Sequence, residues 1–119
     1  MGLAMTPIPF RRGDIWLVDF VPARGHEQDG QRPAAILSID AFSNGPSGLL
    51  IVAPLTRTSR RIPYHVPVRA PEGGVQELSF IMCDQVVTVS QTRVLRHWGS
   101  LSLQTMNEVA DRLRILMDL

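Results

Sequence analysis

The stretch DIWLVDF, residues 14–20, is the clearest strand signal in the chain, and the other elements can be placed outward from it. It is rich in branched and aromatic residues that favour extended backbone, and Pro22 follows shortly after it. Two continuous apolar runs, residues 34–39 and 49–53, predict two further strands. Between them lies NGPSG, residues 44–48, a dense set of turn formers, so we expect short strands joined by turns.

The middle of the chain predicts strands of a different character. Residues 64–68 are interrupted by proline, which cannot donate a backbone hydrogen bond, so they predict an edge strand. A hairpin loop is expected around residues 72–74. The long apolar run 78–89 is broken by Asp84 and Gln85, and polar residues inside such a run usually face solvent or a cleft.

The C-terminal segment changes to a helical period. Ser102 can cap a helix whose apolar residues recur at spacings of three and four. These residues are Leu103, Met106, Val109, Ala110, Leu113, Leu116 and Met117. With 119 residues, 45% of them hydrophobic, the chain fits one domain spanning residues 1–119. We predict a mainly β fold, a small and strongly bent antiparallel sheet or barrel with a C-terminal α-helix.

The charged residues do not by themselves mark a nucleic-acid binder, because the formal net charge is only +1. All twelve basic residues are arginine, and codon bias in a GC-rich genome would explain the missing lysines. Their clustering is a separate observation, with groups at residues 11–12, 57–61 and 93–96. Guanidinium groups bind phosphate oxygens in pairs, so clusters that face one cleft would suit a polyanion.

Several other classes are disfavoured. No apolar stretch approaches the roughly 20 residues that span a bilayer, and the N-terminus lacks a signal-peptide pattern, so we expect a cytoplasmic protein with no membrane partner. The single Cys83 lies in an apolar run, which predicts a buried, inert thiol. We expect no metal and no cofactor, because His26, His65 and His97 are far apart and there is no P-loop pattern. A serine nucleophile is also disfavoured, since no serine lies in a glycine-flanked elbow.

The segment GHEQDGQRP, residues 25–33, is the strongest candidate for a functional loop. It gathers an imidazole, two carboxylates, two amides and a guanidinium, and its glycines and proline argue against a regular element. Median connections between strands run to about 4–6 residues, and longer ones are disproportionately functional. We therefore predict a site there.

Five ordered motifs resemble those of the MazF/PemK toxin family. They are RGDIWLVDF (12–20), GHEQ (25–28), RPA (32–34), APLT (53–56) and CDQV (83–86), and the closing GSLS (99–102) with its helix is also similar. The resemblance covers nearly the whole chain. It implies a small SH3-like barrel, a homodimer and ribosome-independent cleavage of single-stranded RNA at short sequences. It also implies control by a MazE-like antitoxin with an acidic C-terminal tail.

The residues can be matched to that chemistry. Metal-independent RNA cleavage uses the substrate's own 2′-hydroxyl as nucleophile, so the protein must move protons and stabilise charge on the phosphorane. Arg32 can supply a fixed cation and Thr56 a hydrogen bond to a phosphate oxygen, and the resemblance places the catalytic arginine and threonine at these positions. A guanidinium is a poor base near neutrality, so we favour Glu27 as the general base. His26 stands where the family usually has serine, and our hypothesis is that it tunes recognition; it could also titrate or be an inert exposed group.

Other side chains are candidates for RNA contact. The amides of Gln28 and Gln85 can bind base edges of an unpaired strand. Asp84 could orient Arg32 by an ion pair, or equally accept from nearby backbone donors. Arg57, with Arg60 and Arg61 in the same loop, could hold flanking phosphates or be merely solvated. Trp16 and Phe20 share a strand face and predict core or dimer contacts, whereas His65 and His97 are expected to be structural or surface groups.

Two other functions remain open at this point. A CcdB-like gyrase poison would resemble this fold but act by binding a protein. An RNA-binding barrel without catalysis would keep the arginines only. A nuclease differs from both because it needs Glu27, Arg32 and Thr56 to converge on one cleft. An arginine-lined cleft should also attract an acidic peptide, so we expect the antitoxin tail to compete with RNA.

Overall fold

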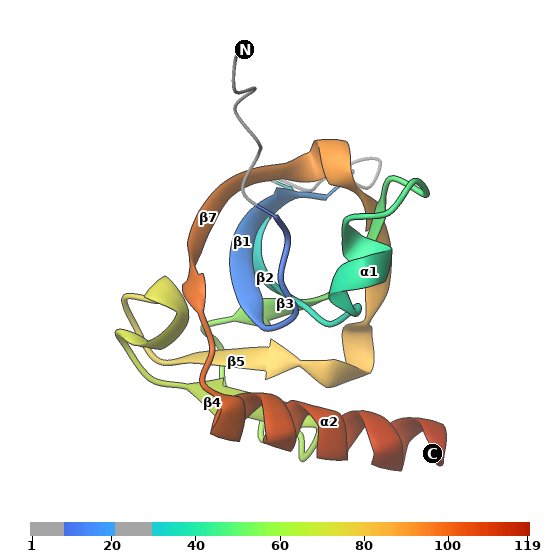
Figure 1. The fold of residues 1–119 in the computed structure, drawn as a ribbon. Helices are drawn as coiled ribbons and strands as arrows, with labels where there is room; N and C mark the ends of the chain where they lie inside the picture. The colour runs from blue at the N-terminus through green and yellow to red at the C-terminus, as the bar shows by residue number, and fades with distance from the viewer. Residues whose placement is uncertain (1–8, 21–29) are drawn as a thin grey trace.

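A strongly bent antiparallel sheet with a helix packed beneath it forms the molecule (Figure 1). The computed structural model describes residues 9–20 and 30–119. Its elements are β1 (Asp14–Asp19), β2 (Gln31–Ile36), α1 (Asp40–Ser43), β3 (Leu49–Thr56), β4 (His65–Val68), η1 (Glu72–Gly74), β5 (Ser79–Met82), η2 (Cys83–Gln85), β6 (Val87–Ser90), η3 (Gln91–Arg93), β7 (Val94–Ser100) and α2 (Leu103–Met117). The predicted fold class is confirmed.

The sheet has the order β4-β5-β3-β2-β1-β7, and β6 pairs with β3 beside this path. β4 lies at the edge, as the proline in residues 64–68 predicts. β3 is the longest strand, with β2 on one side and both β6 and β5 on the other.

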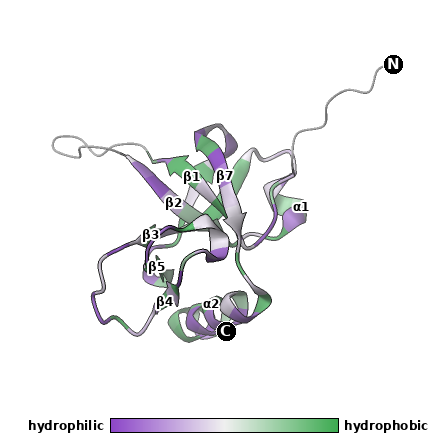
Figure 2. Cartoon of the chain, turned by 90° about the vertical axis from the view of Figure 1, so that its left-hand side faces the viewer, coloured by the Kyte–Doolittle hydropathy of each residue, from purple (hydrophilic) through white to green (hydrophobic). Residues whose placement is uncertain are grey.

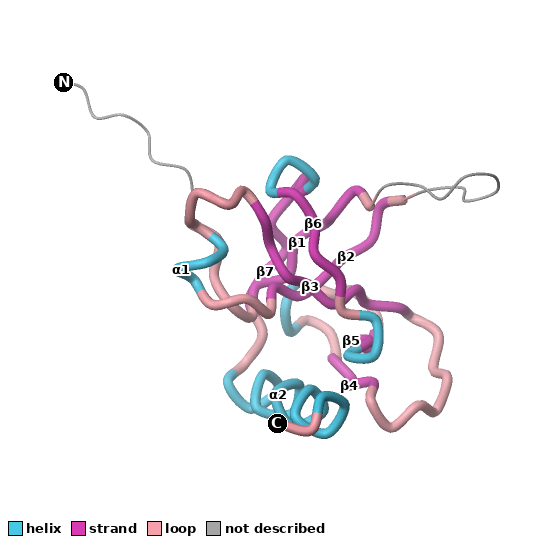
Figure 3. The backbone as a smooth tube through the Cα atoms, turned by 90° about the vertical axis from the view of Figure 1, so that its right-hand side faces the viewer, coloured by secondary structure: helices cyan, strands magenta, loops and turns pink. Residues whose placement is uncertain are grey.

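η2 lets one stretch of chain pair with β3 twice. Leu55 pairs with Ile81 of β5, and Val52 pairs with Val87 of β6. Between these two pairs the segment that runs from β5 to β6 therefore contains three more residues than β3 does. These residues are η2, where the chain turns between β5 and β6 (Figure 3). Asp84 and Gln85 interrupt the apolar run at this turn, and both are exposed, as predicted.

Two apolar clusters make up the core. The first includes Ile15, Ala35, Ile81 and Val109 and joins the sheet to α2. This helix packs against η2 and against β4, which lies above it in Figure 2. The second includes Val18, Ala34, Ile36, Leu50 and Val52 on the other face of the sheet. Neighbours such as Ala34 and Ala35 fall into different clusters because successive side chains of a strand point to opposite faces. Trp16 and Phe20 pack together against the second cluster, which confirms the predicted shared face.

The start and end of β2 differ from the prediction. Residues 31–33 were expected to be irregular, yet they are the first half of β2 and pair with β1. Proline has no backbone N–H to donate. Pro33 pairs with Leu17 of β1 but not with β3, where pairing begins at Ala34, so β2 can hold a proline at this position. The predicted strand over residues 34–39 is wrong beyond Ile36, since Ile39 precedes the unpredicted helix α1.

α2 begins where the sequence predicts. The Ser102 hydroxyl accepts from the Thr105 backbone N–H at 3.1 Å, and the Ser102 N–H donates to Glu72 Oε2 at 2.9 Å. Burial alone would raise the pKa of Glu72, but the hydrogen bonds from the Ser102 backbone and from the Thr105 and Ser102 side chains outweigh it and lower that pKa. No helix within the described ranges is long and apolar enough to cross a membrane.

Only the middle of the predicted apolar stripe of α2 is buried. Met106 and Val109 belong to the first cluster and Leu113 packs against it. Leu103 and Met117, at the two ends of the helix, are 78% and 53% exposed. Within the described residues, α2 packs mainly on β4 and η2, and the two ends of its apolar stripe remain exposed.

A close contact between η1 and β7 joins the two ends of the sheet, at the position of the predicted hairpin loop. Gly74 has a φ of +82°, and a Cβ there would lie 2.3 Å from the carbonyl oxygen of Trp98. Gly99 of β7 is also closely packed, since its Cβ would lie 2.8 Å from the Gly73 carbonyl carbon. Only glycine fits this approach of two backbones.

We expect Gly74→Ala to destabilise the fold more than Gly48→Ala. Both residues have positive φ, so both substitutions carry a strain of about 1–2 kcal/mol. A Cβ at Gly48 meets nothing within 4 Å, whereas the one at Gly74 overlaps the Trp98 carbonyl and should cost about 1–3 kcal/mol more. Urea-induced unfolding measures the difference, and equal losses for the two variants would show that the backbone contact is unimportant.

Candidate functional site

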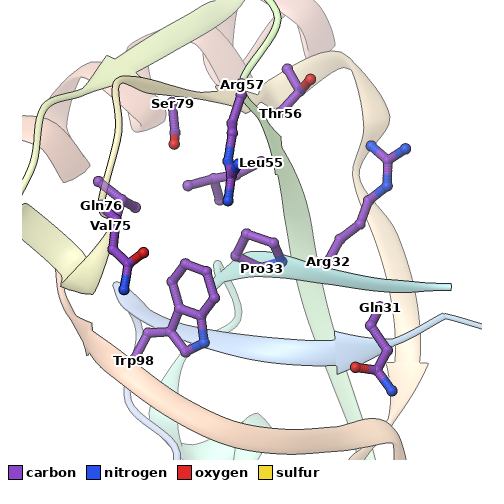
Figure 4. Close-up of a pocket in the computed structure, with 10 residues that line it drawn as sticks. All are labelled: Gln31, Arg32, Pro33, Leu55, Thr56, Arg57, Val75, Gln76, Ser79 and Trp98. Carbon is purple, nitrogen blue, oxygen red and sulfur yellow. The ribbon is translucent and has the colours of Figure 1, made fainter. Parts of the chain in front are cut away.

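A pocket of about 310 Å³ opens where β2, β3 and β7 meet the segment between η1 and β5 (Figure 4). Its lining residues are Gln31, Arg32, Pro33, Leu55, Thr56, Arg57, Val75, Gln76, Ser79 and Trp98. Figure 4 shows Trp98 beside Pro33 on one side and Arg57 reaching in from the end of β3. The pocket therefore combines guanidinium, hydroxyl and amide groups with an apolar wall.

Arg32 and Thr56 reach this pocket through strand register. Ala34 pairs with Pro54 across β2 and β3, and Arg32 and Thr56 each lie two residues beyond that pair. Both side chains line the pocket, so the ends of the two strands bring them to one site. Arg32 is exposed, but its backbone pairs with Val18 of β1. The structure thus brings together the two residues predicted to contact phosphate.

The Thr56 hydroxyl is oriented by its own turn. Its Oγ1 accepts from the backbone N–H of Thr58 at 3.2 Å, and Thr56 pairs with Phe80 of β5. Because the backbone N–H occupies a lone pair of the oxygen, the hydroxyl hydrogen remains able to donate. Thr56 can therefore offer a hydrogen bond to an oxygen bound in the pocket.

Arg57 is a second cation at the pocket, but a loosely held one. Its Nη1 lies 3.3 Å from Glu77 Oε2, and the two side chains are 65% and 62% exposed. Ion pairs this exposed contribute little to stability, so an anionic ligand can draw the guanidinium away at small cost. Arg60 and Arg61 are exposed residues of the same loop and do not line the pocket.

The structure does not place every predicted site residue in the pocket. His26, Glu27 and Gln28 lie outside the described residues. Asp84 and Gln85 lie in η2 and do not line the pocket.

Within residues 9–20 and 30–119, Asp84 contacts neither Arg32 nor a backbone donor. Among the described residues its partner is His65, whose Nε2 lies 2.9 Å from Asp84 Oδ1. The His65 side chain is 3% exposed, and its Nδ1 is buried with no partner within residues 9–20 and 30–119. This pair joins η2 to β4, which confirms a structural position for His65.

Two further sequence predictions can be compared with the structure. Cys83 is buried, as expected, and that burial, with a smaller contribution from nearby Asp84, raises the pKa of its thiol to about 11 despite the opposing charge of Arg112. His97 Nε2 lies 3.0 Å from the buried carboxylate of Asp14, so His97 also has a structural contact. No group of metal-ligating side chains occurs among the residues that the structure describes.

Sequence reasoning missed four residues of the pocket: Trp98, Val75, Gln76 and Ser79. Ser79 is buried, and its hydroxyl donates to the Glu77 carbonyl oxygen at 2.9 Å. These residues come from β7, from the segment between η1 and β5, and from the first position of β5, and no local pattern links them to residues 31–33. The one available signal was a tryptophan beside a glycine in a predominantly polar stretch, RHWGS at residues 96–100.

Comparisons with known proteins find a matching family model and similar relatives. The family model of PemK-like, MazF-like toxins of type II toxin–antitoxin systems matches residues 11–117. The chain is 32% identical over 114 residues to endoribonuclease MazF9 of Mycobacterium tuberculosis, covering 92% of this chain and 97% of that protein. It is 42% identical over 90 residues to endoribonuclease toxin ChpB of Escherichia coli, covering 72% and 69% of the two chains.

Solved structures are similar along nearly the whole chain. The crystal structure of MazF from Deinococcus radiodurans has a TM-score of 0.78 at 27% identity and covers 94% of this chain and 99% of that one. A MazE-MazF crystal structure from the same organism has a TM-score of 0.80 at 27% identity, covering 94% and 98%.

We expect the His65–Asp84 pair to contribute more to the free energy of unfolding than the Arg57–Glu77 pair. Asp84→Ala leaves His65 Nε2 buried without its partner, which should lower the free energy of unfolding by about 1–3 kcal/mol. Arg57→Ala removes an exposed pair and should cost less than about 1 kcal/mol. Urea titrations of both variants against the parent protein measure this, and a loss for Arg57→Ala as large as that for Asp84→Ala would contradict the assignment.

Proposed function

The chain belongs to the family of PemK-like, MazF-like toxins of type II toxin–antitoxin systems, and from this we propose that it is an endoribonuclease that cuts single-stranded RNA without a metal ion. Its curated relatives MazF9 and ChpB are both endoribonucleases. The observation that carries the proposal is the meeting of Arg32 and Thr56 in one pocket. A cation and a hydroxyl donor side by side suit a phosphodiester.

The proposed reaction is an internal transfer at phosphorus. The 2′-oxygen of one nucleotide attacks the adjacent phosphate, the bond from phosphorus to the 5′-oxygen breaks, and the products carry a 2′,3′-cyclic phosphate and a 5′-hydroxyl. Negative charge grows on the non-bridging oxygens in the transition state. The Arg32 guanidinium stabilises that charge and the Thr56 hydroxyl donates to one of these oxygens.

The proton transfers require a group with a lower pKa than a guanidinium. We assign removal of the 2′-hydroxyl proton to Glu27. A water molecule gives the leaving 5′-oxygen the proton that makes it a hydroxyl, and Glu27 afterwards returns its own proton to the solvent. Arg32 acts electrostatically, since an arginine does not give up its proton near neutral pH. In this proposal His26 tunes recognition of the RNA.

Recognition extends beyond the pocket. Arg57 leaves its exposed partner Glu77 to bind a flanking phosphate. Gln28 and Gln85 bind base edges through their amides. Asp84, held by His65, keeps η2 in the position from which the exposed Gln85 can meet an RNA strand.

A MazE-like antitoxin is the proposed protein partner. The D. radiodurans relative is crystallised as a MazE-MazF structure. We propose that this chain forms a homodimer and that an acidic tail of its antitoxin occupies the surface around Arg32 and Arg57, because carboxylates and phosphates bind guanidinium groups in the same way.

The alternative, a gyrase poison that acts by protein binding, is less well supported. Such a protein would need no hydroxyl donor aligned with an arginine inside a pocket. The endoribonuclease relatives match this chain along most of its length, 92% for MazF9. The RNA-cleaving function therefore accounts for more of the observations.

We expect purified protein to cut a long single-stranded RNA at discrete positions in excess chelator. Arg32→Ala should lower kcat/KM at least about 100-fold and Thr56→Val about 10- to 100-fold, since each loses one contact to the developing charge. Arg60→Ala is the matched control, because Arg60 does not line the pocket and should cut nearly as well as the parent. Mapping of fragment ends checks for the cyclic phosphate and the 5′-hydroxyl.

Two results would contradict this mechanism. Cleavage that continues when the 2′-hydroxyl at the cut position is replaced by hydrogen would exclude internal transfer. Cleavage that depends on an added metal ion would exclude the metal-free reaction.

We expect an acidic antitoxin peptide to displace RNA. Fluorescence anisotropy of a labelled RNA with a 2′-deoxy nucleotide at the cut position measures binding without cleavage. Increasing peptide should return the anisotropy to that of free RNA, and a peptide with amides in place of its carboxylates is the control, since it lacks the charge that pairs with Arg32 and Arg57. If saturating acidic peptide leaves RNA bound, the shared surface is wrong.

A further inference from the structure

The pocket has two chemically different halves. Arg32, Thr56 and Arg57 supply charge and a hydroxyl on the side of β2 and β3. The other half is walled by Pro33, Val75 and the indole of Trp98, and Figure 4 shows the Trp98 ring standing next to Pro33 with Gln76 nearby. The charged half accounts for the phosphate but makes no use of the apolar half.

We propose that Trp98 forms a nucleobase subsite in this pocket, where a base next to the scissile phosphate stacks on the indole while Gln76 and Ser79 contact its edge. This rests on the proposed RNA cleavage and identifies the residues that select the sequence cut. Unpaired bases are commonly recognised by stacking on aromatic rings and by hydrogen bonds to their edges.

Trp98 is held firmly enough to act as a platform. Its side chain is partly buried and packs against the first core cluster. Its backbone is fixed by the contact between its carbonyl and Gly74, and the next residue, Gly99, packs on Gly73. A ring fixed in advance loses little conformational freedom on binding, so stacking contributes more of its energy to affinity.

The other tryptophan does not offer such a surface. Trp16 packs between Phe10 and His97, with ring centroids 5.2 Å apart in each pair. It packs against the second cluster and does not line the pocket. Trp16 therefore provides an internal control for experiments on Trp98.

The polar side chains beside Trp98, Ser79 and Gln76, differ in whether they can donate or accept a hydrogen bond in the pocket. The Ser79 hydroxyl already donates to the Glu77 carbonyl at 2.9 Å, so toward the pocket it acts as an acceptor. It therefore favours a base that presents an N–H group at that point, as the exocyclic amines of adenine, cytosine and guanine do. The exposed Gln76 amide can either donate or accept.

Cleavage mapping on an RNA of randomised sequence tests the subsite. We expect Trp98→Leu, which keeps an apolar side chain against the core, to lower kcat/KM at the preferred sites roughly tenfold or more and to lose preference at one nucleotide next to the cut. Trp98→Phe should keep most of both, because it can still stack. An abasic nucleotide at that position should reproduce the loss with the unaltered protein, which separates stacking from any effect on folding.

Tryptophan fluorescence gives a second readout. Binding of the 2′-deoxy RNA should quench the emission of the parent protein and of Trp16→Phe, but leave that of Trp98→Phe unchanged, because only Trp98 lies in the pocket.

Each alternative outcome is decisive. If Trp98→Leu cuts the same sites at the same rate as the parent, or if Trp98→Phe is still quenched, the subsite is wrong while the proposed nuclease function stands. If the parent protein neither cuts nor binds RNA, the proposed function and the subsite both fail.

Discussion

The backbone hydrogen bonds of β3 hold the rest of the structure in place. This strand is hydrogen-bonded to β2 on one side and to β6 and then β5 on the other. The three residues of η2 connect β5 to β6 and so allow both strands to pair with the same side of β3. Thr56, at the end of β3, is thereby held against β5, while Arg32 is carried by β2. The relative position of the two side chains thus depends on main-chain pairing rather than on contacts between the side chains. A donor and a cation positioned in this way need little rearrangement when charge develops on a bound phosphate.

Local chemistry explains which parts of the fold were predictable. DIWLVDF carries its own strand propensity, the proline of residues 64–68 restricts that strand to an edge, and Ser102 supplies its own cap. The first half of β2 was missed because tertiary pairing with β1 overrides the turn preferences of residues 31–33. The candidate site divides in the same way. Arg32 and Thr56 lie in motifs that can be recognised along the chain, whereas Trp98 joins them only through the pairing of β7 with β1, whose two register shifts no sequence pattern reveals.

The electrostatics of the pocket are simple because its cations are arginines. Arg32 and Arg57 both offer guanidinium groups, which can donate two parallel hydrogen bonds to an anionic ligand. Their surroundings differ. Arg57 has an exposed carboxylate neighbour in Glu77, and added salt weakens such an interaction. Near η2 the polar groups are more enclosed, with His65 buried against Asp84 and the Cys83 thiol kept neutral by a pKa of about 11.

The pairing of β7 with β1 also dictates when the molecule can be completed during synthesis. β1 spans residues 14–19 and its partner β7 spans residues 94–100. The hydrogen-bonding edge of β1 that faces β7 therefore stays unpaired until β7 has been made. Trp98 reaches the pocket with that strand, and α2 closes the first core cluster only afterwards. Contacts between residues so distant in the chain form late in folding. A growing chain on the ribosome therefore lacks a finished pocket until β7 has been translated, so the lining of the pocket is completed only after β1, β2 and β3 have been made.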